Sequence, residues 1–361
     1  MTVMTTSIAV TRTKESRISE TDFNNLEFGK YISDHMFISS YKNGQWQEMR
    51  VVPYGEIPMT PAMLALHYGQ SVFEGLKAFR DDNGNICVFR LAKHAARLNK
   101  SLERMCMPSI SEEMFTHGIH TLLEVDEKWI PTSEGASLYI RPVVFATESR
   151  FGVKISDEYL FVIMTSPVGP YFSKPLRLKV EDTFVRAAEG GTGFAKCAGN
   201  YGGAFYPTKL AREEGFDQVL WTDAREHKYI DEAGVMNVMF VIDGKLITPK
   251  LSSAILDGVT RDSILQLAPL LGIETEERRI TVDEVVKGFE EGTLTEAFGA
   301  GTAAVVSPIA TITIKGVDYH LPEVTNASLQ QRVKQKLNNI RLGLESDPFG
   351  WNYLIPGHGV L

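Results

Sequence analysis

A single lysine stands among glycines and other small residues in the segment 190–203. This residue is Lys196, and Tyr201 follows it within the same segment. Glycines allow a backbone to approach a bound group closely, and small neighbours leave an amine room to reach into a pocket. A solvated glycine loop is the alternative interpretation of the same segment.

Two phosphate-binding motifs do not fit this lysine. A P-loop needs lysine after glycine and before serine or threonine, whereas Lys196 stands between Ala195 and Cys197. The dinucleotide fingerprint could begin at Gly191 and Gly193, but Lys196 then occupies a position that needs glycine or alanine. Burial favours the neutral, nucleophilic form of an amine, so a confined lysine is suited to forming a Schiff base. Pyridoxal phosphate is the cofactor that uses such a lysine.

Other segments offer what pyridoxal phosphate needs. Glu232 lies in an otherwise apolar strand context and is a candidate partner of the ring nitrogen, with a surface carboxylate as the alternative. The segment 256–261 leads into an expected helix, whose first amides bind anions such as phosphate. Thr302, in a turn of small residues, and Arg97, in an expected helix, are further phosphate candidates. The alternatives are ordinary helix capping, a tight turn and a solvent-facing arginine.

The composition is that of a globular protein with room for about two domains: 361 residues, 43% hydrophobic and 23% charged. The net charge of -8, without any block of like charges, argues against a nucleic-acid partner. Three scattered cysteines indicate a reducing cytoplasm and no disulfide scaffold. No apolar stretch approaches the roughly 20 residues of a membrane span, and residues 1–20 do not resemble a secretory signal. We expect a cytoplasmic protein with no membrane partner and no metal site.

Local patterns predict an α+β arrangement. A helix is expected over 91–105, and Ser109-x-x-Glu112 predicts the cap of the next helix. Thr281-x-x-Glu284 predicts another cap, and Asp243-Gly244 predicts the turn of a hairpin. Strands are expected at 36–41, 45–52, 86–89, 137–144 and 159–165 in the first half of the chain.

Prolines and glycines cluster between 167 and 175, which places a linker at about 167–186. The expected domains are a small N-terminal domain at 1–174, beginning with an irregular arm at 1–30, and a cofactor-binding domain at 175–361.

Five segments in register resemble the branched-chain amino acid aminotransferases, the larger subgroup of the class IV pyridoxal-phosphate enzymes. They are residues 73–79, 137–142, 196–201, 232–237 and 298–303. The similarity in order and spacing extends from about 31 to 342. The resemblance implies a homodimer with a two-domain α+β fold, in which a small N-terminal α/β domain precedes a larger C-terminal domain with a barrel-like β core.

The resemblance also implies roles in holding pyridoxal 5'-phosphate. Lys196 resembles the Schiff-base lysine, Tyr201 the partner of the phenolic oxygen, and Glu232 the partner of the ring nitrogen. The residues that match phosphate ligands are Arg97, Val259, Thr260 and Thr302. Arg186 is a further candidate for the cofactor site.

The substrate pocket is implied in the same way. The positions that match its side-chain pocket are Tyr68, Phe73, Tyr139, Val153 and Tyr171, and core packing is the alternative for these aromatic residues. Thr302 and Ala303 match the turn that receives the α-carboxylate. Arg141 is a candidate for binding the second carboxylate of glutamate, which an apolar pocket alone would exclude.

The implied reaction is reversible transfer of an amino group between L-leucine, L-isoleucine or L-valine and 2-oxoglutarate, in two ping-pong halves. A D-amino acid aminotransferase and an aminodeoxychorismate lyase are alternatives within the same fold. A pyridoxal-phosphate-binding protein without turnover is the alternative outside the enzymes.

Overall fold

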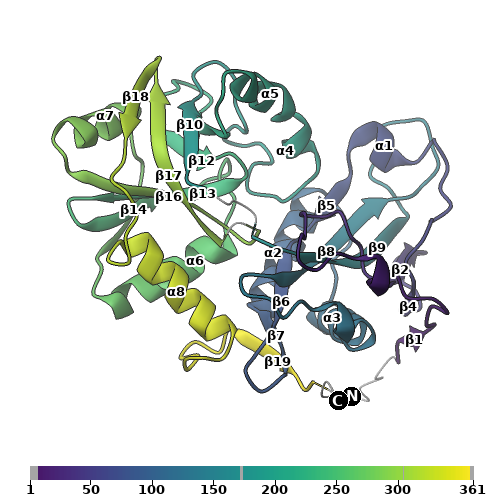
Figure 1. The fold of residues 1–361 in the computed structure, drawn as a ribbon. Coiled ribbons are helices and arrows are strands. Elements are labelled where there is room, and N and C mark those ends of the chain that lie inside the picture. Colours follow the sequence, from purple (N-terminus) through teal and green to yellow (C-terminus); the bar gives the residue numbers. More distant parts are fainter. Residues whose placement is uncertain (1–6, 171–173, 304, 358–361) are drawn as a thin grey trace. The chain divides into compact units, whose positions relative to one another are not determined.

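The computed structural model describes residues 7–170, 174–303 and 305–357, and the chain divides into two compact units (Figure 1). The first unit comprises Met1–Tyr171 together with Asn339–Leu361, and the second comprises Phe172–Asn338. The division near residue 171 lies within the segment where the sequence placed a linker. The sequence also placed residues 339–361 in the second domain, whereas the structure groups them with the first unit.

A ten-stranded sheet forms the first unit, in the order β1-β4-β2-β9-β8-β6-β7-β19, with β3 beside β2 and β5 beside β8. Its strands are β1 Ala9–Val10, β2 His35–Lys42, β3 Gln45–Trp46, β4 Arg50–Pro53, β5 Ser71–Phe73, β6 Leu76–Arg80, β7 Ile86–Phe89, β8 Ser137–Ala146, β9 Tyr159–Val168 and β19 Asn352–Ile355. The long pair of β8 and β9 is antiparallel, and β19 returns from late in the chain to pair with β7. The yellow β19 is visible beside β7 in Figure 1.

The expectation of one strand over 45–52 was wrong. Two strands, β3 and β4, occupy this segment, and both pair with β2. Lys42 faces Gln45 but Ile38 faces Arg50, so the β4 side carries one extra residue, which is a β-bulge. A bulge adds one residue without interrupting the run of strand-forming residues. The sequence pattern over 45–52 therefore resembles that of one continuous strand.

Among the described residues, the first unit contains the helices α1 Leu64–Tyr68, α2 Leu91–Arg104 and α3 Glu112–Val125, with short 3-10 turns η1 Ile18–Glu20 and η2 Glu127–Trp129. The buried face of α2 includes Leu91, Leu98 and Leu102, as the helical spacing predicts. The cap expected at Ser109 was wrong by two residues. Ser111 is the N-cap of α3, and its side chain accepts a hydrogen bond from the Met114 amide.

A nine-stranded sheet forms the second unit. Its order is β12-β11-β10-β17-β16-β13-β14-β15, with β18 beside β17, and β12 also pairs with β13. This additional pairing closes six of the strands into a barrel, as the barrel-like core implied by the resemblance requires. The strands are β10 Leu176–Val180, β11 Gln218–Thr222, β12 Ile230–Ala233, β13 Met236–Ile242, β14 Lys245–Pro249, β15 Thr275–Arg278, β16 Leu294–Gly301, β17 Val305–Ile314 and β18 Val317–His320.

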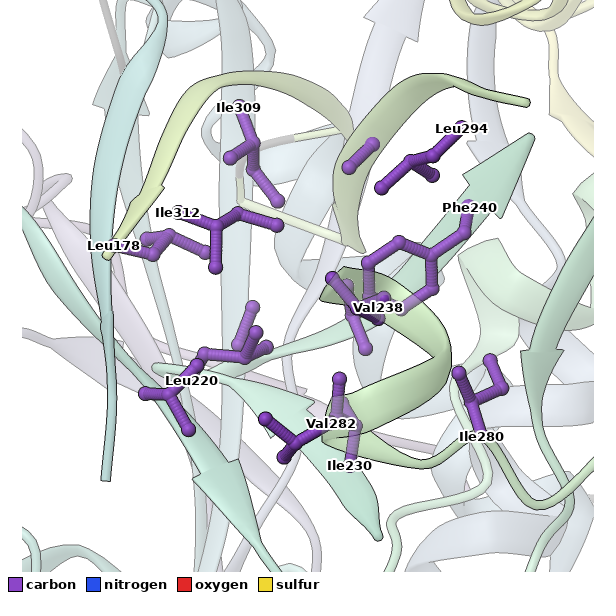
Figure 2. Close-up of a cluster of buried hydrophobic side chains, with 14 of the residues drawn as sticks. Leu178, Leu220, Ile230, Val238, Phe240, Ile280, Val282, Leu294, Ile309 and Ile312 are labelled. Atoms are coloured by element: carbon purple, nitrogen blue, oxygen red, sulfur yellow. The ribbon is translucent and has the colours of Figure 1, made fainter. Parts of the chain in front are cut away.

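Alternating side chains of these strands fill a shared apolar core, part of which is drawn in Figure 2. On β13 the core side chains are Met236, Val238, Phe240 and Ile242. Because successive side chains of a strand point to opposite faces, Asn237 points away from this core. Its partner across the ladder is Glu232, which lies on the same face as Asn237. The two polar side chains are thereby directed to the outer face of the barrel.

The helices of the second unit are α4 Gly199–Gly202, α5 Phe205–Glu213, α6 Val259–Leu267 and α7 Val282–Glu290, with a 3-10 turn η3 Ala268–Leu271 after α6. Helix α8 Leu329–Arg341 begins in the second unit, and its residues from Asn339 onward belong to the first. The two local predictions for this unit are confirmed. Thr281 caps α7 by accepting from the Glu284 amide. Asp243 and Gly244 form the β13–β14 turn with φ of 52° and 73°, the left-handed values that a two-residue hairpin turn requires.

None of the helices within the described residues has both the length and the apolarity of a membrane-spanning segment. Within those same residues, no group of three or more histidine, cysteine, aspartate or glutamate side chains is placed to hold a metal ion.

Candidate active site

The lysine singled out by the sequence is held beside its tyrosine. Lys196 Nζ donates to the hydroxyl of Tyr201 over 2.9 Å, and Tyr201 belongs to the short helix α4. The Asn200 side chain fastens the backbone just before the lysine. It donates to the carbonyls of Thr192 and Ala195, each over 2.8 Å, and accepts from the Thr192 hydroxyl. These bonds fix the loop from which Lys196 projects.

A close backbone approach explains one glycine of this loop. A side chain at Gly193 would collide with the carbonyl of Ala254 and with Ala187. Arg186 connects the same two segments, because its Nη2 donates to the carbonyls of both Gly193 and Ala254. The lysine loop is thus tied to the segment that precedes helix α6.

Glu232 is buried and has three polar neighbours. Its Oε1 accepts from Asn237 Nδ2 over 3.1 Å and from the Leu256 amide over 3.0 Å. Its Oε2 lies 2.7 Å from Arg186 Nε, an ion pair that lacks the alignment of a hydrogen bond. Burial raises the pKa of Glu232, against the opposing charges of Arg186 and Lys196. A further cationic N–H beside Oε2 would therefore favour the charged carboxylate.

The entry to α6 is built for close contact. Gly258 is the N-cap residue and supplies no capping side chain, and a Cβ there would collide with Asn237 Oδ1. Asn237 Nδ2 also donates to the Leu256 carbonyl, so one side chain links Glu232 to this entry. Val259 and Thr260 are the first helical residues, and amides in this position have no acceptor within their own helix. They are placed to bind an anion.

The turn that carries Thr302 and Ala303 follows β16. Within the ladder, Ala300 of β16 pairs with Asn237, which in turn pairs with Glu232. Glu232, Asn237 and Ala300 thus form one row of paired residues across three strands. Thr302 lies two residues beyond Ala300, just past this row. Lys196, Glu232 and the α6 entry are linked by the contacts above, and the strand register brings the Thr302 turn to the same rim of the barrel.

The first unit brings three of the expected substrate residues together. Arg141 donates through Nη2 to the Tyr139 hydroxyl over 3.0 Å, and its guanidinium carbon lies 4.6 Å from the centre of the Phe73 ring. Tyr139 also packs edge-on against Phe28. Arg141 Nε is buried and has no hydrogen-bond partner among the described residues. An arginine with an unused buried donor is suited to receiving an anionic group.

Two other expected pocket residues are exposed. The side chain of Tyr68, at the end of α1, is 41% exposed, and that of Val153, in the loop before β9, is 84% exposed. Tyr171 lies outside the described residues.

Arg97 is buried on α2 rather than solvent-facing. Its Nε and Nη2 donate to the two carboxylate oxygens of Glu74 over 2.7 and 2.8 Å, and His94 Nδ1 lies 2.9 Å from the same carboxylate. Burial alone would raise the pKa of Glu74, but Arg97 and His94 hold it well below its usual range. Arg97 is therefore part of a buried charged network with Glu74 and His94.

The comparisons with known proteins identify the family. Residues 71–312 match the family described as Amino-transferase class IV. The chain belongs to the class IV aminotransferases. A branched-chain-amino-acid transaminase 1 of Bacillus subtilis (strain 168) is 45% identical over 335 residues, which cover 91% of this chain and 94% of that protein. The branched-chain-amino-acid aminotransferase 2 of the same organism is 42% identical and covers 97% of each chain.

Solved structures agree with this class IV assignment. A branched-chain aminotransferase of Thermoproteus uzoniensis with norvaline is 26% identical with a TM-score of 0.74, covering 89% of this chain and 99% of that chain. A branched-chain amino acid aminotransferase of T.th. complexed with N-(5'-phosphopyridoxyl)-L-glutamate is 26% identical with a TM-score of 0.69, covering 87% of this chain and 97% of that chain. Class IV aminotransferases are pyridoxal-phosphate enzymes. The chain is therefore a transaminase by family.

The donor set of the second unit fits that cofactor. An amine, a buried acid and an uncapped helix start are the groups that an aldehyde, a basic ring nitrogen and a phosphate require. They are supplied by Lys196, Glu232 and Val259-Thr260, and the glycines at 193 and 258 allow the close packing of the lysine loop and of the α6 entry. The raised pKa of Glu232 is consistent with a carboxyl group awaiting a cationic partner.

Three residues of this class IV site received no role from the sequence. Asn200 and Asn237 lie inside the segments that carry the resemblance, so their positions were visible, but nothing in their spacing indicated which carbonyls they bind. Glu74 was likewise visible beside Phe73. Its pairing with Arg97 depends on α2 packing against this strand, which no local pattern reveals.

Proposed function

We propose that the protein is a branched-chain amino acid aminotransferase that transfers the amino group between L-leucine, L-isoleucine or L-valine and 2-oxoglutarate, using pyridoxal 5'-phosphate. The observation that carries the proposal is the linked set of Lys196, Tyr201 and Glu232 at one rim of the barrel. The curated relatives at 41–45% identity bear the same activity in their names. They do not favour the D-amino acid aminotransferase, the lyase or the non-catalytic alternative.

The cofactor's groups have partners in the second unit. Lys196 would hold the aldehyde, Tyr201 would donate to the phenolic oxygen, and Glu232, oriented by Arg186 and Asn237, would hold a proton on the ring nitrogen. Val259, Thr260 and Thr302 would bind the phosphate. When bound, the cofactor supplies an electron-accepting ring that stabilises negative charge developing at the substrate α-carbon.

Lys196 then has a second task. With its amine free, Lys196 would remove the proton from the substrate α-carbon as a general base and return a proton as a general acid. The Tyr201 hydroxyl, 2.9 Å from Nζ, keeps the amine positioned for this transfer. The hydrogen bonds of Asn200 hold the loop before Lys196, which keeps the amine aligned with the substrate α-carbon during both proton transfers.

Substrate recognition falls to two groups of residues. Thr302 and Ala303 would receive the α-carboxylate at their turn. Phe73 and Tyr139 would contact an aliphatic side chain, and Arg141 would bind the second carboxylate of glutamate through its buried donor. Discrimination among the three aliphatic substrates is expected to be weak, since one methylene in an apolar pocket is worth about 1–3 kcal/mol.

The proposed assembly is a homodimer. Large apolar side chains are exposed on α1, on the segment just before it and on the loop before β9, and the Thr60 and Ser149 hydroxyls are hydrogen-bonded to each other across these segments. They are Met59, Leu66, Tyr68, Phe151, Val153 and Ile155. An exposed cluster of this kind marks an association surface, and covering it with a second copy would also bury Tyr68 and Val153. A cytoplasmic location stays a prediction based on the scattered cysteines.

The test is a titration of the purified holoenzyme with L-leucine, L-valine, L-glutamate and D-alanine in parallel, following the cofactor spectrum. The first three should convert the cofactor to its amine form, and D-alanine should not. Lys196→Ala should abolish turnover, whereas Lys209→Ala, an exposed lysine on α5, should leave it unchanged. Conversion by D-alanine alone, or turnover by Lys196→Ala at the wild-type rate, would overturn the proposal.

A further inference from the structure

One face of the β8–β9 ladder carries the pair of Tyr139 and Arg141. Tyr139 lies directly opposite Ser166 of β9, and Arg141 lies opposite Met164. Residues that face each other in an antiparallel pair point to the same side of the sheet. Ser166 therefore shares a face with Tyr139 and Arg141. It is the direct neighbour of the tyrosine and the diagonal neighbour of the arginine.

The hydroxyl of Ser166 is buried and lacks a partner. Only 5% of the residue is exposed, and its Oγ has no hydrogen-bond partner among the described residues. Arg141 Nε, which belongs to a side chain of the same face, is likewise buried without a described partner. Buried polar atoms of proteins are mostly hydrogen-bonded, and an unpaired one is unfavourable. Two unpaired polar atoms at neighbouring positions of one face indicate that a polar ligand group binds between them.

The polar stretch of this face is short. Beyond Arg141 the face becomes apolar, and Met164, Val162 and Val143 belong to one hydrophobic cluster. In the other direction the face ends at Ser137, whose Oγ is also buried without a described partner and which lies opposite Val168. A ligand that fits this face therefore carries one polar group on a mainly apolar chain.

The charge of Arg141 determines which polar group fits. Its contacts within the described residues are with Tyr139 and Phe73, and neither of these is an acid. A carboxylate has two oxygens, so one can accept from Arg141 Nε while the other accepts from the Ser166 hydroxyl. Leucine, isoleucine and valine have no such group on their side chains, and they would leave the hydroxyl unpaired.

We propose that Ser166 is a specificity-determining residue whose hydroxyl donates a hydrogen bond to the second carboxylate of glutamate and 2-oxoglutarate, beside Arg141. The inference rests on the proposed function, because it concerns the same substrate side chains. Ser166 favours the dicarboxylate substrates over the aliphatic ones, since its hydroxyl is paired only when a carboxylate is bound.

The experiment measures kcat/KM of the half-reactions of L-glutamate and L-leucine separately, by following the cofactor spectrum of the holoenzyme. Ser166→Ala should lower the glutamate value about 10-fold, because hydrogen bonds to charged groups are strong, and should change the leucine value less than twofold. Thr165→Val is the matched control. Thr165 Oγ1 is also buried without a described partner, but neighbouring residues of a strand point to opposite faces, so the ratio of the two values should not change.

Binding and stability distinguish this role from a structural one. In calorimetric titrations of the holoenzyme, Ser166→Ala should bind glutarate, a dicarboxylate, about 10-fold more weakly and isocaproate, an aliphatic monocarboxylate, as tightly as wild type. In the Arg141→Met background the same change should weaken glutarate binding less, because both residues bind one carboxylate. The melting temperature of Ser166→Ala should not fall, since an unpaired hydroxyl does not stabilise the fold.

An unchanged ratio of the glutamate and leucine values in Ser166→Ala would overturn the inference. Equal losses for both substrates would also overturn it, because they indicate a hydroxyl that holds a water molecule or supports the sheet. A wild-type holoenzyme that reacts with neither amino acid is a different result, which refutes the proposed function together with this inference. Should Ser166→Ala fail to fold, a crystal structure of the wild-type holoenzyme with glutarate decides: a carboxylate oxygen within hydrogen-bonding distance of Ser166 Oγ supports the inference, and a carboxylate bound elsewhere overturns it.

Discussion

Replacing Glu74 by glutamine should strongly destabilise the first unit. The substitution keeps the shape of the side chain but removes the charge that balances Arg97, which is only 6% exposed. It also replaces one acceptor of the two-bond contact with an amide that itself donates toward Arg97 and His94. Breaking one side of a buried ion pair costs about 3–5 kcal/mol, because the other charge stays buried and unpaired. For a unit of this size, that is a fall in Tm of roughly 10 °C.

The effect should depend on pH in a direction that the Glu74 carboxyl fixes. Its pKa in the folded protein is lowered from its ordinary value of 4.5. Its stabilising contribution is complete above that ordinary value and is lost as the pH falls through the folded-state pKa. The difference in Tm between wild type and Glu74→Gln should thus be full at pH 7 and shrink only in acid below about pH 4.5.

The assay is thermal and urea unfolding of wild type, Glu74→Gln, Arg97→Met and the double variant. Because the two residues stabilise each other, the double variant should be less destabilised than the sum of the single variants, by about 1–3 kcal/mol. Glu134→Gln, in an exposed loop, is the matched control and should change stability by less than about 0.5 kcal/mol. A loss below about 1 kcal/mol for Glu74→Gln, or strict additivity in the double variant, would refute the reasoning.

Three further predictions concern the site. Asn200→Asp replaces two donated hydrogen bonds with repulsion between oxygens, so kcat should fall about 10- to 100-fold in steady-state assays, and an unchanged kcat would exclude the clamp. Arg141→Met should reduce kcat/KM of the glutamate half-reaction about 10- to 100-fold and that of leucine by less than threefold; equal losses would count against its role. Burial and the neighbouring Glu232 raise the pKa of Asp231 to about 7, so ionisation weakens the fold as pH rises toward 7. Asp231→Asn should accordingly raise stability by about 2 kcal/mol at pH 8 and by less at pH 5, whereas an equal gain at both pH values would disprove the titration.

Local features of the fold were predictable where the cause is local. The Thr281 cap and the Asp243-Gly244 turn depend on side chains and backbone angles within a few residues. Ser109 and Ser111 both precede α3, and the choice between them depends on where the preceding chain enters the helix, which the sequence does not state. The pairing of β19 with β7 joins segments more than two hundred residues apart, so no local pattern could show it.

The candidate site likewise combines contacts that are local in sequence with contacts that depend on the complete fold. Lys196 and Tyr201 are close in sequence, and their contact follows from a short helical turn. The ion pair of Arg186 with Glu232 requires the barrel to be closed first, because the two residues belong to different strands and loops. The resemblance identified Arg97 as a phosphate candidate but could not reveal that a buried carboxylate already holds two edges of its guanidinium.

The discontinuous first unit imposes an order on folding during synthesis. When residues 172–338 have left the ribosome, every strand of the closed barrel is available and the second unit can fold by itself. The first unit at that moment still lacks β19, and β7 is an open sheet edge able to pair with strands of other chains. Only the arrival of residues 352–355 covers that edge. A ribosome that stalls shortly before this strand would hold a complete barrel joined to an aggregation-prone sheet. The last strand to be made therefore protects the first unit from pairing with other chains.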